Sequence, residues 1–160
     1  MSMKQELAIH EMLDHAWRYF ELHAGQRMSL FNFFLVVSGV ILAGLAACLQ
    51  LTGSLRLLGL CLGVLLAVVA FTFWKLDQRV SFLIKHAEDA IVGIEKLLPL
   101  DVARLFSNER GRTAAHKSVG IGLVRPWTYG SAFRFIFWIM GLVGISGGTL
   151  SLARYLGWIR

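Results

Sequence analysis

The chain has 160 residues, 56% of them hydrophobic and only 16% charged, and its mean hydropathy is +0.62. A typical soluble domain has about 25% charged residues. The apolar residues also gather in blocks close to bilayer length, which a water-soluble fold does not need. These features exclude an ordinary soluble domain and predict an all-α integral membrane protein with the lipid bilayer as its solvent.

Residues 1–27 carry seven charged side chains, so they lack the early apolar core of a cleavable signal peptide. Their apolar residues instead recur every three or four positions, which predicts an amphipathic helix that runs into the first membrane span. We expect this segment to remain on the mature protein, on the cytoplasmic side. The stripe consists of Ile9, Leu13, Ala16, Phe20 and Ala24.

Two charge-free runs follow, separated by a short break. Residues 28–51 supply 24 residues, which is about 36 Å of helix, and residues 57–74 supply 18, close to the lower limit for a span. Because the sequence Thr-Gly-Ser interrupts the apolar pattern, residues 52–56 are expected to form an external turn. The two runs therefore predict a transmembrane hairpin.

A second amphipathic segment follows the hairpin. Over residues 75–98 the apolar residues again recur at helical spacing, until Pro99 ends the pattern. Packed on residues 1–27, this helix extends the first two spans into the cytoplasm as a helical stalk of about 36 Å. A partner helix or a sister subunit is an alternative cover for the same stripe.

The remaining sequence divides into a basic loop, a third apolar run and a short tail. Periodicity fades over residues 99–134, which we expect to form a cytoplasmic loop with one short helix near 101–106. Residues 135–153 are a charge-free run of 19 residues with four glycines, expected to form the third transmembrane helix or to dip back as a re-entrant segment. Residues 154–160 then form an external tail.

Lys and Arg are distributed unevenly between the two sides that this topology creates. Residues 1–27 contain 3 and residues 75–134 contain 10, whereas the turn contains 1 and the tail contains 2. Basic residues near span ends are retained in the cytoplasm. The count of 13 against 3 places the amino terminus and the central segment in the cytoplasm. An odd number of spans then places the carboxyl terminus outside.

Polar and charged side chains cluster where the predicted stalk meets the membrane. Polar groups at that depth need partners, because an unsatisfied group in hydrocarbon is costly. We therefore predict a polar collar at the cytoplasmic membrane interface; the alternative is that the arginines reach separately to lipid headgroups while Asn32 caps or bridges helices. The collar residues are Arg18, His23, Gln26, Arg27, Asn32, Asp77 and Arg79.

Each predicted span contains a pair of small residues four positions apart, a spacing that lets two helices approach closely. Such faces mark helix contact within one subunit or between the subunits of a homo-oligomer, and the motif does not distinguish the two. The pairs are Gly39 with Ala43, Gly59 with Gly63, and Gly144 with Gly148.

The basic loop offers candidates for contact with anionic lipid headgroups, at about 1 kcal/mol for each basic residue near the surface. Retention of positive charge in the cytoplasm explains the same residues without a specific contact. They are Arg110, Arg112, Lys117 and Arg125.

Residues that could carry catalysis or hold a metal are scarce. Cys48 and Cys61 fall in apolar runs without the flanking ligands of a zinc site, so we interpret them as packing residues. The sequence has no phosphate-binding glycine loop, no HExxH and no nucleophile elbow. We therefore expect no enzymatic activity, no cofactor, no metal and no nucleic-acid partner.

A ribonuclease is kept as a remote alternative. Three Arg–His pairs have the spacing of a metal-independent ribonuclease motif, in which His acts as acid or base and Arg holds phosphate, although about one such pair is expected by chance. The pairs are Arg18 with His23, Arg79 with His86, and Arg110 with His116.

Three stretches together carry a family resemblance. They are W-x-Y-F-x-x-H-x-x-Q-R at residues 17–27, F-N-F-F-L-V at residues 31–36 and K-L-D-x-R…L-I-K-x-A-E at residues 75–88. In these stretches the chain resembles the small bacterial membrane proteins encoded beside antiphage systems, including effectors of retrons and nucleotide-signalling systems and CRISPR-associated membrane proteins. The resemblance implies an oligomeric inner-membrane effector that perturbs or permeabilises the membrane when an infection signal reaches its cytoplasmic helices. The third apolar run departs from the two-span plan of some of these effectors.

Two other functions compete with this hypothesis. A non-conducting membrane anchor or scaffold would use its stalk to recruit a cytoplasmic protein partner. A small-solute transporter would normally have charged side chains or broken helices at the bilayer midplane, where this chain has only Gly, Ser, Thr and Cys as polar or small interruptions.

Overall fold

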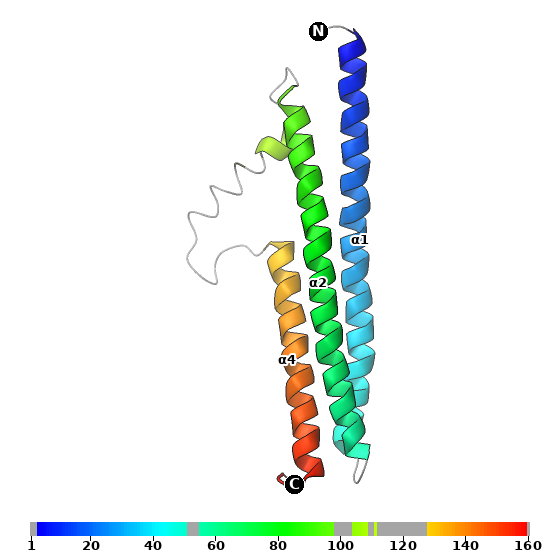
Figure 1. Ribbon diagram of the computed structural model, residues 1–160, viewed down its shortest axis with the longest axis vertical. Coiled ribbons are helices and arrows are strands. Elements are labelled where there is room, and N and C mark those ends of the chain that lie inside the picture. Colours follow the sequence, from blue (N-terminus) through cyan, green and yellow to red (C-terminus); the bar gives the residue numbers. More distant parts are fainter. Residues whose placement is uncertain (1–2, 51–54, 98–103, 109–110, 112–127, 160) are drawn as a thin grey trace. The chain divides into compact units, whose positions relative to one another are not determined.

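The computed structural model describes residues 3–50, 55–97, 104–108, 111 and 128–159. Most of these residues belong to three long helices, α1 (Met3–Gln50), α2 (Leu55–Glu95) and α4 (Tyr129–Tyr155) (Figure 1). No strand occurs in these ranges. All three helices are long and apolar enough to cross a membrane. The predicted all-α class with three apolar helices is therefore confirmed.

The helices extend beyond the predicted spans. Helix α2 already includes Leu55 and Arg56, which the sequence had assigned to a turn, and α4 begins at Tyr129, six residues before the third apolar run. The start of α4 is set by Thr128, whose backbone is extended and whose hydroxyl accepts a hydrogen bond from the N–H of Ser131 at 3.3 Å. Residues 129–134 are thus helical and are not part of a loop, because an N-cap satisfies the first amide groups.

The chain divides into two compact units. We call the first, made from Met1–Arg27 and Arg79–Trp127, the amphipathic unit. The second, made from Met28–Gln78 and Thr128–Arg160, is the bundle unit. Helices α1 and α2 contribute to both, and α4 belongs to the bundle unit alone.

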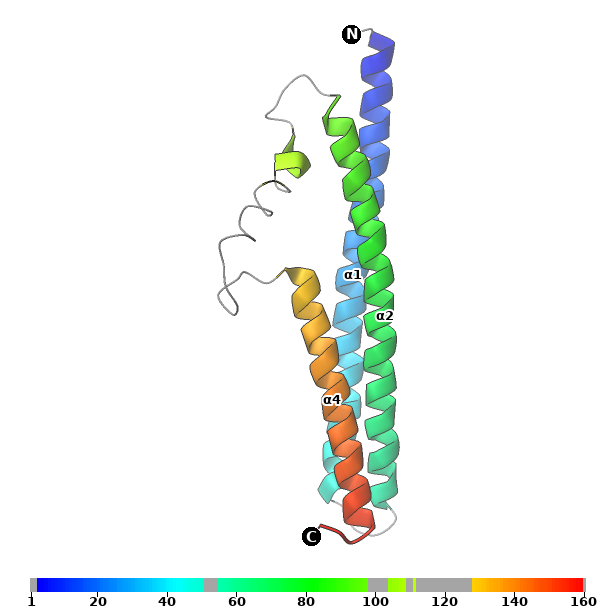
Figure 2. The same cartoon turned by 60° about the vertical axis from the view of Figure 1, so that its left-hand side comes forward.

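In the bundle unit, the parts of α1, α2 and α4 lie side by side in both views (Figures 1 and 2). Its best-packed layer is aromatic. Phe34 is fully buried among Ala70, Phe133 and Phe137, with its ring edge-on to Phe137 at 4.7 Å between centroids. Phe31 stacks flat on Phe133 at 3.9 Å. Aromatic pairs of this kind add about 0.5–1.5 kcal/mol to simple area burial.

The backbones of α2 and α4 approach closely at glycine. A Cβ atom on Gly63 would lie 2.5 Å from the carbonyl oxygen of Gly144 and 2.6 Å from the Cα of Gly148, and a Cβ on Gly144 would lie 2.7 Å from the carbonyl oxygen of Gly63. Real side chains do not tolerate such distances. Gly59 similarly faces the side chain of Ser151. The two GxxxG pairs of α2 and α4 therefore pack against each other within one subunit.

Polar bonds tie the three helices together where α1 and α4 end and α2 begins. The Arg154 guanidinium donates to the carbonyl oxygen of Leu49 at 2.7 Å, and the Arg56 guanidinium donates to the carbonyl oxygen of Arg154 at 2.7 Å. The Ser151 hydroxyl donates to the carbonyl oxygen of Arg56 at 2.6 Å. The last carbonyls of a helix have no intrahelical donor, so Arg154 satisfies a group at the end of α1 that lipid would leave unpaired. Arg56 adds a second donor to the Arg154 carbonyl, which also accepts the N–H of Gly157.

In the amphipathic unit, α1 and α2 bury one apolar face each. Ala16 is buried on α1, and Val80, Ile84, Ala87 and Ile91 are buried on α2 at the three- and four-residue spacing of one helix face. Their burial leaves charged side chains such as Glu11, Arg18 and Lys85 on the exposed surface. On α1 the predicted stripe is buried at Ala16 and half-buried at Ile9, Leu13, Phe20 and Ala24.

Substitution of Gly63 by Ala is expected to destabilise the bundle by about 1–3 kcal/mol, because the added methyl collides with the α4 backbone. The matched control is Gly93→Ala, where no described atom lies within 4 Å of the new Cβ and the helix gains about 0.8–1.0 kcal/mol of intrinsic propensity. Thermal unfolding followed by circular dichroism in detergent measures both. Equal stability of the two variants would contradict the close approach.

Candidate functional site

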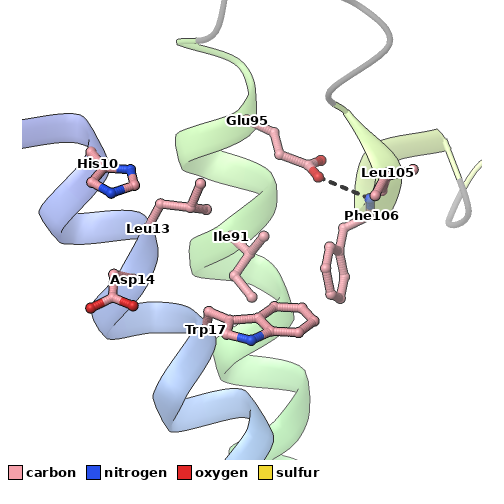
Figure 3. A pocket seen from close by; sticks show the side chains of 8 residues that line it. All are labelled: His10, Leu13, Asp14, Trp17, Ile91, Glu95, Leu105 and Phe106. Atoms are coloured by element: carbon pink, nitrogen blue, oxygen red, sulfur yellow. Dashed lines mark hydrogen bonds between the residues drawn. The ribbon is translucent and has the colours of Figure 1, made fainter. Parts of the chain in front are cut away.

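A buried carboxylate in the amphipathic unit binds a short segment that follows α2 in the sequence. Glu95 is only 2% exposed. Its carboxylate oxygens accept hydrogen bonds from the N–H of Phe106 at 2.9 Å, the N–H of Ser107 at 2.9 Å and the hydroxyl of Ser107 at 2.7 Å. Figure 3 shows the bond from the N–H of Phe106 to Glu95. Phe106 and Ser107 belong to residues 105–108, one helical turn that we call the docked segment. Three donors on one carboxylate make this a strong local attachment.

Aromatic contacts fasten the docked segment to α1 as well. The ring of Phe106 lies edge-on to Trp17 at 6.0 Å and to Phe20 at 5.4 Å between centroids. Trp17 and Phe20 also contact each other at 5.6 Å. The docked segment therefore contacts both helices of the unit, α1 through an aromatic cluster and α2 through a carboxylate.

The hydrogen bonds determine the charge state of Glu95. Burial raises the pKa of its carboxyl, but the N–H of Phe106, the hydroxyl and N–H of Ser107 and the positive charge of Arg104 together outweigh burial. The net result is a pKa below the ordinary value of 4.5. Glu95 is therefore ionised at neutral pH, as its three donors require.

Beside the docked segment lies an open cavity of about 300 Å³. Leu13, Trp17 and Ile91 give it an apolar floor, and His10 and Asp14 from α1 lie at its edge (Figure 3). Within the described ranges, no three His, Cys, Asp or Glu side chains are arranged to hold a metal ion. The cavity can accept an apolar group flanked by a donor, and it has no nucleophile paired with a base.

The seven predicted collar residues fall in both units. Arg18, His23, Gln26, Arg27 and Arg79 belong to the amphipathic unit, whereas Asn32 and Asp77 belong to the bundle unit.

Arg18 forms an exposed ion pair with Asp14 at 3.0 Å, and the His23 ring is 2.9 Å from the side-chain oxygen of Gln26. Asp77 is buried and Asn32 is exposed. Neither unit contains all seven residues, so a single collar formed by them stays a prediction.

The small-residue faces have different environments. Gly59, Gly63, Gly144 and Gly148 are all buried and pack inside the subunit. Gly39 and Ala43 on α1 are exposed, and no described atom lies within 4 Å of a Cβ built on Gly39. Only the α1 pair is therefore left without a helix packed on it in the subunit.

The other predicted sites are largely untested by the structure. The headgroup candidates Arg110, Arg112, Lys117 and Arg125 lie outside the described residues, as does the pair Arg110 with His116. Of the remaining Arg–His pairs, Arg18 and His23 have separate partners, and Arg79 and His86 are both exposed.

Sequence reasoning missed Glu95 and Phe106. Glu95 continues the buried spacing of Ile84, Ala87 and Ile91 on α2, so it places a carboxylate on an apolar stripe, where a charge needs specific partners. A carboxylate at an apolar position of the stripe is the sequence feature that points to Glu95. Phe106 had no comparable signal, because its contacts are made with residues distant in the sequence.

Long apolar helices joined to amphipathic ones define a multi-pass helical membrane protein. The chain belongs to the octameric membrane protein family, whose model matches residues 10–147. It is also similar to CD-NTase-associated protein 19 of Escherichia coli, with 41% identity over 132 residues that cover 82% of this chain and 85% of the relative. No solved structure matches the chain. The chain is therefore a small, oligomeric membrane component of antiphage defence, as its sequence resemblance implied.

Glu95→Gln is expected to release the docked segment, because a neutral amide accepts weaker hydrogen bonds from Phe106 and Ser107. A loss of about 1.4 kcal/mol corresponds to a tenfold fall in hydrogen-exchange protection of the two amides. Glu11→Gln, on the exposed surface of α1, is the matched control and should leave protection unchanged. Equal protection in the wild type and Glu95→Gln would contradict the role of the carboxylate.

Acid is expected to mimic that substitution. Because the pKa of Glu95 is lowered in the folded state, its stabilising contribution is complete above the ordinary value of 4.5 and is lost as the pH falls through the lowered value. The protection factor of the Phe106 amide should therefore be constant at neutral pH and fall below pH 4.5. In Glu95→Gln the same titration should be flat; a parallel fall there would assign the acid effect to another group.

Proposed function

We propose that the chain is an effector of the bacterial inner membrane that perturbs or permeabilises the bilayer when an infection signal reaches its cytoplasmic helices. The observation that carries the proposal is membership of an octameric family by a subunit whose three apolar helices can each cross a membrane. Eight such subunits in a closed ring surround an axis. An axial opening through the bilayer provides a path for ions.

The amphipathic unit is proposed to receive the signal. Its docked segment is fastened by one carboxylate and one aromatic cluster, contacts that a partner or ligand in the adjacent cavity can displace. The Escherichia coli relative is named for its association with a CD-NTase. We extend this association to the present chain, which would act with such an enzyme.

Membrane potential and dye entry test the proposal directly. Cells that carry the chain with its neighbouring genes should lose membrane potential and admit propidium iodide after phage challenge, and the purified protein should release ions from liposomes. Gly63→Leu, which cannot pack α2 on α4, is the inactive control. If potential persists under every activating condition while a soluble protein co-purifies in stoichiometric amount, the chain is instead a non-conducting scaffold.

The proposed orientation has its own test. With the amino terminus and the basic segment in the cytoplasm, a phosphatase reporter fused after residue 160 should be active in the periplasm, and the same reporter fused before residue 1 should be inactive. The reverse pattern would place the amphipathic unit outside, where a cytoplasmic signal cannot reach it.

A further inference from the structure

The side of α1 that faces away from the bundle combines glycine and alanines with an amide and two valines. Buried positions on this part of α1 are Phe34, Ser38, Ile41, Leu45 and Cys48. At 100° per residue, the opposite side of the helix carries a different set, all of it exposed, which we call the α1 outer face. It consists of Asn32, Val36, Gly39, Val40, Ala43 and Ala47.

The exposed sides of α2 and α4 differ from the α1 outer face. On α2 they carry bulky residues such as Leu58 and Leu65, and on α4 they carry Trp138 and Leu142. Bulky apolar side chains suit lipid, whereas small ones let another helix approach. The glycine pairs of α2 and α4 already pack inside the subunit, so the α1 outer face remains for a contact between subunits.

Asn32 gives independent support for a protein partner on this face. Its amide lies one helical turn inside the charge-free run and is exposed on the α1 outer face. No hydrogen bond of this side chain is found within the described part of the subunit. An amide facing hydrocarbon is costly, and across a helix interface it finds donors and acceptors.

A complementary surface exists elsewhere on the bundle. A groove of about 390 Å³ runs between α2 and α4. Its walls are formed by Leu60, Val64 and Phe71 from α2 and by Ile145 and Thr149 from α4. A helix with small side chains can enter such a groove. The bulky side chains of the groove walls then fill the space above the glycine and alanines of the entering helix.

The α1 outer face and this groove point in roughly opposite directions. On α4, Gly147 contacts Leu45 of α1, whereas Ile145 and Thr149 lie on the other side of the helix and line the groove. A closed ring of eight turns by about 45° at each subunit, so its two seams must face about 135° apart. A smaller groove between α1 and α4, beside Leu42, lies too close to the α1 outer face to satisfy this condition.

The two surfaces also lie at the same depth along the bundle. Within the subunit, Gly44 of α1 is level with Leu62 of α2, since a Cβ on Gly44 would be 3.2 Å from the Leu62 side chain. Phe34 is likewise level with Phe73. The groove between Leu60 and Phe71 thus has the height of the α1 outer face, as a ring without axial rise requires.

We propose that in the octamer the α1 outer face of each subunit packs into the α2–α4 groove of the next. The contact is head-to-tail, because one self-complementary face can build a pair but not a ring of eight. It uses only the bundle unit. It therefore goes beyond the proposed permeabilisation and holds equally for a non-conducting octamer.

Disulfide cross-linking in native membranes tests the seam. In a background with Cys48→Ala and Cys61→Ala, the double variant Ala43→Cys with Val64→Cys should give an oxidised ladder that ends at the octamer. Each single variant should remain monomeric on the gel. Disulfide-linked dimers of the single variant Ala43→Cys would show that α1 packs on α1, and this would overturn the proposal. A double variant that does not cross-link, although native mass spectrometry shows octamers, would also overturn it.

A steric variant provides the second measurement. At Gly39 no described atom lies within 4 Å of an added Cβ, and the position is exposed. In Gly39→Leu, helix content and monomer stability should therefore be unchanged, while the octamer fraction falls about tenfold because eight seams are obstructed. Leu65→Phe, which enlarges an exposed side chain of α2 that does not line the groove, is the matched control and should assemble normally. Octamers that survive Gly39→Leu would overturn the proposal. Surviving octamers that still release ions from liposomes would show that the seam is wrong while the proposed function holds.

Discussion

In hydrocarbon, helices gain nothing by hiding apolar side chains from one another, so they associate through close backbone packing and polar bonds. The contact of Gly63 with Gly144 and Gly148 is the interaction on which this subunit depends. It fixes α4 against α2 and thereby brings Ser151 to the carbonyl of Arg56. The same contact forms the groove that we propose receives the neighbouring subunit.

Each of the two units is stabilised internally by a different kind of interaction. Packed aromatic rings and glycine contacts hold the middle of the bundle unit, and bonds from Arg56, Ser151 and Arg154 hold its end. The amphipathic unit adds a single ionised carboxylate, Glu95, which holds the docked segment through three hydrogen bonds. A contact of this kind can be exchanged for another acceptor or donor, and this makes the amphipathic unit the better candidate for receiving a signal.

Assembly and signal reception can then be assigned to separate parts of the chain. In the proposed ring, both seam surfaces come from the bundle unit, and neither the docked segment nor its cavity is used for subunit contact. Such a division lets the oligomer persist before any signal arrives. A change at the amphipathic unit then needs only to shift an existing equilibrium between two arrangements of the ring.

Much of this molecule is determined by sequence alone. Uninterrupted apolar length requires three membrane helices, because only lipid solvates such runs, and the periodic stripes of residues 1–27 and 75–98 identify the amphipathic segments. The spacing of Gly39, Gly59, Gly63 and Gly144 marked helix contacts without saying which lay inside the subunit. Tertiary structure decided that question, since it depends on which faces α2 and α4 turn toward each other. It also revealed the pairings of Glu95 and Arg154, because hydrogen bonds between distant segments leave no periodic trace in a sequence.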